Sequence, residues 1–342
     1  ATQLPPANAS TNPILVPAVR NWLPGRAPNW TLVHDMLSME ADRANHVANL
    51  VGLTQGGGYK GLVVDYREIK TEDRKLYSDF IRTLQKALHA EGLWLAVTVD
   101  TPTPLTEGAW DTGGYDWTAL GQAADQVRVV MPLDPQAYAP GGIAEQLLEW
   151  GTSKVERYKL HPIYSTLSTD GEKTLPLNEA LAPLGNIKLT QTVTDSVLPG
   201  TPLNFQLGAA SLDIDPNTGA GELVVGDKTL WLGTPQWLRN RLALTDRYNL
   251  GGVVIRDILD SGNLPNMIAA VADYKATNEE TSYSAIPEIT WQVSGPQGQT
   301  TQTSTSLTQP QFVWTTPDIT GTYQIAASVA GSNKGSMRIS VG

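Results

Sequence analysis

Four residues whose side chains can move protons or pair charges follow one short apolar stretch of this sequence. The stretch is Leu-Val-Val at residues 62–64, and it is followed by Asp65, Tyr66, Arg67 and Glu68. A carboxyl group can serve as a general acid or base, whereas a guanidinium stays charged at every useful pH and pairs with carboxylates. Because polar groups at the carboxyl end of a barrel strand usually carry chemistry, this cluster is the first candidate for a functional site.

The spacing of the cluster divides its members between two faces. Asp65 and Arg67 are two residues apart, so on an extended strand both point to the same side, and Glu68 points to the other. Two interpretations of the pair remain open: a ligand-binding site at the mouth of a barrel, or a structural salt bridge at its rim. Glu68 is expected to begin a turn in solvent, and only a bulge would return it to the mouth as a catalytic candidate beside Asp65.

Similar positions after other predicted strands supply further candidates for ligand binding. Asp134 and Asp257 stand at the ends of apolar stretches. Asp134 fits a turn or a rim hydrogen bond as well as a ligand contact, whereas Asp257 either lines the mouth of the barrel or points outward by alternation. Trp110 and Tyr138 fall on loops that follow strands, where they either stack on a ligand ring or anchor the loop by packing. The four histidines show no ligand spacing, so we expect no metal site, and we expect no cofactor.

Apolar strands alternate with helical patterns around these candidates. A helix that begins at Thr71 and ends before Gly92 carries an apolar stripe at Leu76, Phe80, Leu84 and Leu88. The other predicted elements are strands at residues 13–19, 61–64, 93–99, 127–133 and 253–259, and helices at residues 35–55, 117–124 and 234–249. Fully apolar strands that alternate with helices indicate an α/β fold with a parallel sheet, either a TIM-type barrel or a doubly wound sheet.

Two segments depart from this alternation and contain predicted antiparallel strands. Residues 160–232 contain alternating segments joined by Asp-Pro-Asn-Thr-Gly, which predicts a β-rich insertion built from hairpins. Residues 276–287 form a polar linker, and residues 288–342 contain four alternating strands. We interpret the last segment as a small immunoglobulin-like β-sandwich in which Tyr323 is the corner tyrosine.

The composition excludes several classes of function. A net charge of −10 disfavours binding to nucleic acid or to anionic lipid. The absence of cysteine excludes disulfides and thiolate chemistry, and no apolar run reaches the roughly 18 residues of a membrane span. Charged residues make up only 17% of a sequence rich in Thr, Ser, Asn and Gln, which favours an extracellular or cell-surface protein.

Five predicted elements follow one another in residues 36–99. They are a helix, a glycine-rich turn, the strand that ends at Asp65, a second helix and the strand LWLAVTV. This order resembles the family 18 glycoside hydrolases, the chitinase-like barrels, and in particular the bacterial spore-cortex and peptidoglycan-associated branch. VVMPLD at residues 129–134 is similar to the family's M-x-Y-D strand, and residues 230–258 are similar to its final helix and strand. The resemblance covers roughly residues 13–275 and implies a TIM-type barrel that acts on N-acetylglucosamine-containing glycans.

The catalytic motif is where the sequence departs from this family. When residues 60–67 are aligned with the family motif D-G-x-D-x-D-x-E, the chain retains Gly61 and Asp65. Arg67 stands at the position of the general-acid glutamate. The tyrosine of M-x-Y-D falls on Leu133, and Asp134 remains. In this family the sugar's N-acetyl group attacks while a protonated carboxyl group delivers a proton to the leaving oxygen. The arginine at this position is therefore a departure from the family that indicates a pseudoenzyme.

The family's barrel begins with two strands before the one that is similar to residues 13–19, whereas here residues 1–12 read as a linker or a truncated beginning. We therefore expect a barrel that lacks its first units, completed by a longer chain or by a homo-oligomer or larger surface assembly.

The sequence is compatible with three functions. The favoured one is a non-catalytic, glycan-binding scaffold at the cell surface. The others are an active hydrolase of chitin or peptidoglycan that uses Glu68 or another acid, and a structural subunit of a surface layer or filament.

Overall fold

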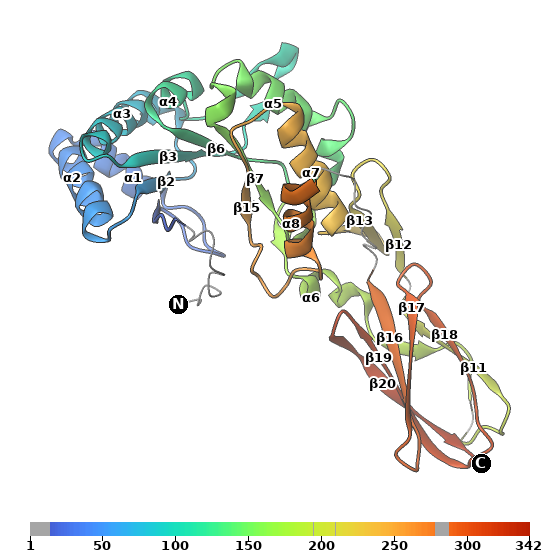
Figure 1. The fold of residues 1–342 in the computed structure, drawn as a ribbon. Coiled ribbons are helices and arrows are strands. Elements are labelled where there is room, and N and C mark those ends of the chain that lie inside the picture. Colours follow the sequence, from blue (N-terminus) through green and yellow to red (C-terminus); the bar gives the residue numbers. More distant parts are fainter. Residues whose placement is uncertain (1–13, 194, 209, 278–286) are drawn as a thin grey trace. The chain divides into compact units, whose positions relative to one another are not determined.

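The computed structural model describes residues 14–193, 195–208, 210–277 and 287–342 (Figure 1). The predicted linkers at residues 1–12 and, for the most part, 276–287 lie outside this range. The chain forms two compact units, each assembled from separate stretches: Ala1–Met131, Ile143–Tyr164 and Leu244–Val254 in the first, and Pro132–Gly142, Ser165–Ala243 and Ile255–Gly342 in the second.

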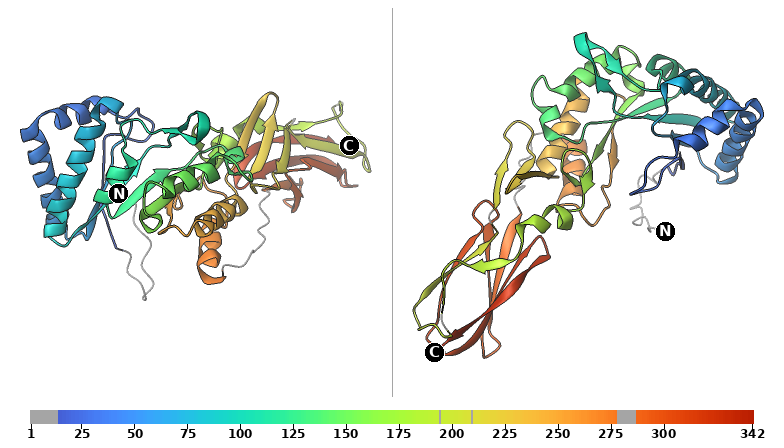
Figure 2. Two further views of the ribbon diagram at one scale, coloured as in Figure 1. Left: turned by 90° about the horizontal axis from the view of Figure 1, so that it is seen from above. Right: turned by 180° about the vertical axis from the view of Figure 1, so that it is seen from behind.

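The first unit is built on a curled parallel sheet whose outer face carries helices (Figures 1 and 2). The sheet has the order β1-β2-β3-β6-β7, followed by β15 (Val254–Arg256), whose first residue belongs to this unit. Its strands are β1 (Ala18–Arg20), β2 (Gly61–Asp65), β3 (Trp94–Val99), β6 (Gln126–Val130) and β7 (Leu160–Ser165). The helices are α1 (Trp30–Ser38), α2 (Glu40–Gly56), α3 (Arg74–Ala90), α4 (Trp117–Ala123) and α5 (Ile143–Thr152). The predicted α/β class with a parallel TIM-type sheet is confirmed.

Packing of α3 against the sheet supplies much of the core of this unit. Phe80, Leu84 and Leu88 on α3 are at most 1% exposed, as the four-residue spacing predicts, whereas Leu76 at the start of the stripe is only half-buried. All five residues of β2 are buried, because helices cover one face and the curl of the sheet shields the other. Each buried leucine contributes about 1.5–3 kcal/mol.

Gly61 is the first residue of β2 and is required by the close approach of the next strand. A Cβ on this residue would lie 2.6 Å from the backbone oxygen of Trp94 and 2.3 Å from its indole ring. Since backbone cannot move aside cheaply, only glycine fits here. The glycine that the sequence retains from the family motif is therefore explained by packing rather than by chemistry.

Two elements of the first unit differ from the sequence prediction. The strand expected at residues 13–19 is reduced to three residues, Ala18–Arg20, which are exposed or half-buried because β1 lies at the edge of the sheet. The helix expected at residues 35–55 is two helices, α1 and α2, since Met39 between them is extended. Apolar spacing alone does not reveal a single extended residue between two helices.

The second unit contains the predicted antiparallel insertion, although it starts later than expected. Residues 160–165 form β7, a fully buried strand of the parallel sheet, and the antiparallel strands begin after it. They are β8 (Ser168–Thr169), β9 (Thr174–Leu175), β12 (Ala210–Ile214), β13 (Gly221–Val225) and β14 (Lys228–Leu232), in the order β12-β13-β14-β8-β9. Helices α6 (Leu177–Ala180) and α8 (Met267–Thr277) also belong to this unit, as does α7 (Pro235–Arg247) up to Ala243.

The hairpin turn predicted from Asp-Pro-Asn-Thr-Gly is present between β12 and β13. The Asp215 carboxylate accepts the backbone N–H groups of Asn217 and Thr218 at 2.8 and 3.3 Å. Gly219 adopts a φ of +74°, which side-chain-bearing residues rarely adopt.

Two sheets face each other in the C-terminal β-structure. One holds β16 (Glu288–Ser294), β17 (Thr300–Ser306), β19 (Gly321–Val329) and β20 (Ser332–Val341), in the order β17-β16-β19-β20. The other joins β18 (Gln311–Thr315) to two strands from the middle of the chain, β10 (Ile187–Leu189) and β11 (Pro202–Leu207).

Aromatic rings hold these two sheets together. Trp291 stacks on Phe312 with ring centroids 5.4 Å apart, and Phe205 lies 6.4 Å from the same ring. The Tyr323 hydroxyl donates to the carbonyl of Ile319 at 2.9 Å, which is the bond of a tyrosine corner. Because β10 and β11 belong to one of the two sheets, the sandwich is not made by residues 288–342 alone.

Truncating Phe205 tests whether β11 is a structural strand of the sandwich. Phe205 is fully buried, so Phe205→Ala is expected to lower the free energy of unfolding by about 3–5 kcal/mol. Urea denaturation monitored by tryptophan fluorescence measures the loss. Lys188→Ala, at the exposed position of β10, is the control and should change stability by about 0.5 kcal/mol or less. Equal effects of the two substitutions would contradict this packing.

Candidate functional site

The candidate site lies at the carboxyl ends of three neighbouring parallel strands of the first unit. Asp65 ends β2, Arg20 ends β1 and pairs in register with it, and Arg67 follows two residues later. β3 pairs with β2 so that Val97 lies beside Val64, and continuing this register brings Asp100 beside Arg67. Because strand ends meet at one edge of a parallel sheet, four charged residues from distant parts of the sequence come together.

Arg67 is held between two carboxylates. Its Nε donates to Asp65 Oδ1, and its Nη1 donates to Asp100 Oδ1 at 3.0 Å. Arg20 approaches the second oxygen of Asp65, with Nε 3.6 Å from Oδ2. The side chain of Arg67 is only 12% exposed and that of Asp65 only 9%, so these ion pairs are largely shielded from solvent.

The electrostatics of this cluster keep the guanidinium charged. Burial by itself lowers the pKa of Arg67, but the carboxylates of Asp65 and Asp100 outweigh it and raise the pKa above its ordinary value. An arginine with a raised pKa does not release a proton at any pH that the protein survives. Arg67 therefore cannot act as a general acid.

Asp100 makes two further contacts beside Arg67. Its Oδ2 accepts the backbone N–H of Glu68 at 2.7 Å and lies 2.9 Å from the hydroxyl of Tyr115. The same hydroxyl lies 2.8 Å from the carbonyl of Tyr66. Asp100 is not among the site residues predicted from the sequence. Its position directly after the apolar strand LWLAVTV is the feature that would have indicated it.

Backbone contacts fix the polypeptide on the other side of Arg67. The Asn21 amide accepts the N–H of Arg67 at 2.8 Å and donates to its carbonyl at 3.0 Å. The Trp22 indole donates to the carbonyl of Asp65 at 3.2 Å, and the guanidinium of Arg20 stacks over its ring at 4.6 Å. Asn21 and Trp22 were not predicted, because nothing in their local sequence distinguishes them from loop residues.

Glu68 turns away from the pair formed by Asp65 and Arg67. Its φ is +57°, a left-handed conformation that few residues other than glycine adopt. The side chain is 51% exposed, and its carboxylate lies 3.8 Å from Nζ of Lys70. The alternation of side chains between the two faces of the strand therefore ends at Arg67. The carboxylate of Glu68 makes a surface ion pair with Lys70.

Tyr66 anchors the end of β2 on the helix-covered face. Its hydroxyl is 2.6 Å from Nε2 of His46, and its ring stacks with His46 and with Phe80. Burial lowers the pKa of His46 below its usual 6.5, so this imidazole is neutral at pH 7. Tyr66 therefore separates the charged cluster from the apolar layer beneath it.

The other sequence-predicted residues make local contacts, and three of them belong to the second unit. Asp134 Oδ1 accepts the N–H of Gln136 at 2.9 Å, as a turn residue does. The hydroxyl of Tyr138 donates to the carbonyl of Pro132 at 2.8 Å, and Asp257 accepts from the Ser165 hydroxyl at 2.7 Å. Trp110 belongs to the first unit and packs against Trp150. Of the predicted residues, the structure brings Asp65 and Arg67 into one cluster.

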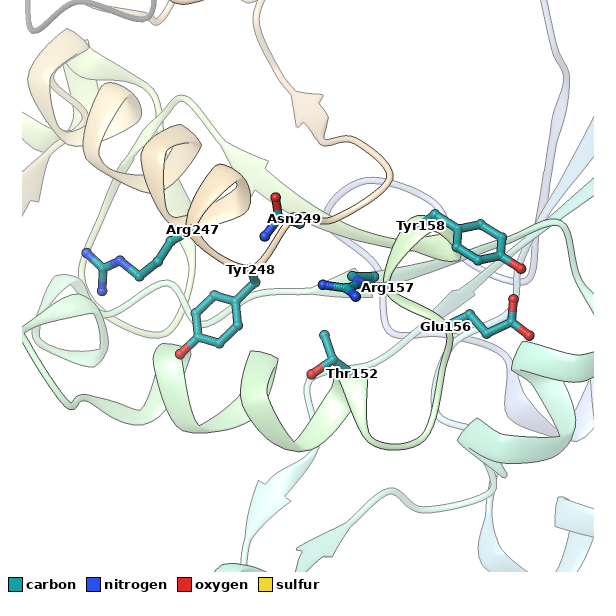
Figure 3. A pocket seen from close by; sticks show the side chains of 7 residues that line it. All are labelled: Thr152, Glu156, Arg157, Tyr158, Arg247, Tyr248 and Asn249. Atoms are coloured by element: carbon teal, nitrogen blue, oxygen red, sulfur yellow. The ribbon is translucent and has the colours of Figure 1, made fainter.

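A separate surface pocket of the first unit contains none of the predicted residues. Figure 3 shows this pocket of about 550 Å³, which is lined by Thr152, Glu156, Arg157, Tyr158, Arg247, Tyr248 and Asn249. These residues precede β7 and β15 in the chain, so the pocket lies at the amino ends of the strands. Chemistry in barrels is placed at the opposite ends, which leaves the Asp65–Arg67–Asp100 cluster as the candidate site.

The part of the chain that the structure describes contains no group of three or more His, Cys, Asp or Glu side chains arranged to hold a metal ion. In the same residues, no helix combines the length and apolarity needed to cross a lipid bilayer.

Comparison with known proteins relates the chain to bacterial glycosylases. No protein-family model matches it. A putative sporulation-specific glycosylase of Bacillus subtilis is 28% identical over 99 residues, which are 29% of this chain and 23% of that protein. A cortical fragment-lytic enzyme of the same organism is 25% identical over 167 residues, 46% of this chain and 38% of that protein. The chain thus spans less than half the length of either relative.

Solved structures agree on the fold. A class V chitinase from Pseudomonas fluorescens superposes with a TM-score of 0.57 at 20% identity, covering 75% of this chain and 79% of that structure. The predicted resemblance to chitinase-like barrels is confirmed at the level of the fold.

Removing Arg67 tests how strongly the cluster depends on it. Arg67→Ala leaves Asp65 and Asp100 close together without their shared cation, and it should lower the free energy of unfolding by about 3 kcal/mol. Thermal and urea denaturation measure the change. Arg82→Ala removes an exposed ion pair with Asp79 and should cost less than about 1 kcal/mol. A loss at Arg67 no larger than this control would mean that the cluster does not stabilise the fold.

The neutral imidazole of His46 predicts a pH dependence of stability. The folded-state pKa of His46 is lowered, so the folded protein binds fewer protons than the unfolded chain once the pH falls below about 6.5. Stability should therefore fall between pH 7 and pH 5. His46→Gln, which keeps a hydrogen-bond partner for Tyr66, should lose less stability over this range than the wild type does. Parallel melting curves at both pH values measure the difference, and identical pH slopes would contradict it.

Proposed function

We propose that this chain, which has the fold of the chitinase-like family 18 glycoside hydrolases, binds a glycan without cleaving it. The observation that carries the proposal is the position of Arg67. It stands where the resembled motif has its acid, and its guanidinium is fixed between Asp65 and Asp100. Hydrolysis of a glycosidic bond needs a proton at the leaving oxygen, and no proton is available from this side chain.

The nearest alternative acid is poorly placed for the same reaction. Glu68 is next in sequence, but its carboxylate is half-exposed and lies beside Lys70. A general acid in glycosidases is normally protonated near neutral pH because its surroundings are apolar, and a solvated carboxylate beside an ammonium group lacks such surroundings. The geometry therefore favours binding over turnover.

The class of glycan follows from the relatives. Their names describe a sporulation glycosylase, a cortical fragment-lytic enzyme and a chitinase, all of which act on glycans. We infer that N-acetylglucosamine-containing polymers, chitin-like or peptidoglycan-like, are the ligand. A cell-surface location is part of this proposal, and it is supported by the low charged fraction of 17% and the many Thr, Ser, Asn and Gln residues.

An activity assay and a binding assay together test the proposal. We expect chitotetraose or soluble peptidoglycan fragments to give a binding isotherm by calorimetry. A chromogenic chitobioside should be turned over at least about a hundredfold more slowly than by a chitinase assayed in parallel, since loss of a general acid costs 10²–10⁴-fold.

The remaining outcomes identify the competing functions. Turnover that Glu68→Gln abolishes would establish a hydrolase and overturn the proposal. An absence of binding heat with every glycan would instead favour a structural subunit of a surface layer or filament.

A further inference from the structure

We propose that the first unit carries a second glycan-contact surface, outside the strand-end cluster, in a groove formed by Trp110 and Trp150. This groove, the Trp110–Trp150 groove, has a volume of about 280 Å³, and Leu105, Gln146 and Glu149 also line it. The contacts of Asp65, Arg67 and Asp100 described above are made with other residues. The inference rests on the proposed glycan-binding function and names a site for it.

Two elements build the groove from opposite sides. A short hairpin after β3, made of β4 (Thr103–Pro104) and β5 (Trp110–Asp111), presents Trp110, with Pro104 paired to it in register. Helix α5 presents Gln146, Glu149 and Trp150, which lie on one face because residues three and four apart are neighbours on a helix.

The two indole rings are held in place before any ligand arrives. The ring of Trp150 meets the buried ring of Trp117 edge-on, with centroids 4.9 Å apart and an interplanar angle of 60°. Trp110 lies 5.9 Å from Trp150 at an angle of 38°. Trp117 is 3% exposed, whereas the other two rings remain partly exposed. Rings fixed in this way lose little entropy when a ligand stacks on them.

A pyranose ring matches the chemistry of the groove. One face of the ring presents C–H bonds, which suit the negative face of an indole, and its edge presents hydroxyl groups. Glu149 offers carboxylate oxygens and Gln146 an amide at the polar side. Leu105, which is 57% exposed, offers an apolar contact for a methyl group such as that of an N-acetyl substituent.

Two other occupants are less compatible with these residues. Nucleic acid and other polyanions are repelled by Glu149 and by the net charge of −10. Proline-rich peptides dock in aromatic grooves as well, but their recognition does not use a row of hydroxyl partners. The peptide is therefore kept as an outcome of the test.

Titration of the full chain with chitotetraose tests the inference by two readouts. In protein labelled with ¹⁵N at tryptophan, the indole signals of Trp110 and Trp150 should shift on binding. By calorimetry, Trp110→Ala should weaken binding about tenfold and Glu149→Ala about threefold. Tyr158→Ala, an exposed aromatic residue in the pocket of Figure 3, is the matched control and should leave the affinity unchanged. Both groove substitutions lie at partly or fully exposed positions, so melting temperatures check that the fold is retained.

The outcomes separate this inference from the function on which it rests. Binding with wild-type affinity in both groove variants overturns the groove site and leaves glycan binding intact. Absence of binding in the wild type overturns the proposed function and the groove site together. Shifts of the two indole signals by decaproline, without shifts by chitotetraose, would identify the groove as a peptide site and also overturn the inference.

Discussion

The charged bridge from Asp65 through Arg67 to Asp100 is the interaction on which the site depends. It ties the end of β2 to the end of β3, and Asp100 extends it to the backbone of Glu68 and to Tyr115. A buried ion pair of this kind is costly to desolvate, so its carboxylates must be satisfied by several donors. Here those donors are Arg67, the backbone N–H of Glu68 and the hydroxyl of Tyr115.

This bridge changes what the fold can do. In a hydrolase, the corresponding position must deliver a proton during the reaction, which requires a group with a pKa near the working pH. A guanidinium between two carboxylates does not meet this requirement, because both carboxylates stabilise its charged form and raise its pKa. Fold similarity to chitinases therefore does not by itself fix the chemistry of this chain.

The structure also explains why the second unit is discontinuous in sequence. Strands β10 and β11 come from the middle of the chain, yet β11 pairs along its length with β18. A sheet of three strands presents an apolar face to β16 and β19, and the stacked rings of Trp291 and Phe312 fill the space between. An isolated set of four strands would leave that face in water, which is unfavourable.

The sequence by itself determined the local features. It indicated the alternation of strands and helices, the stripe on α3, the Asp215 turn and the presence of Arg67 in place of a carboxyl group. Each depends on periodicity or on a single residue type, which a linear reading detects. Tertiary structure alone decided which partners surround Arg67 and which strands complete the sandwich. Those outcomes depend on register between segments far apart in the chain, such as Asn21 with Arg67 and β11 with β18, and no local pattern encodes that register.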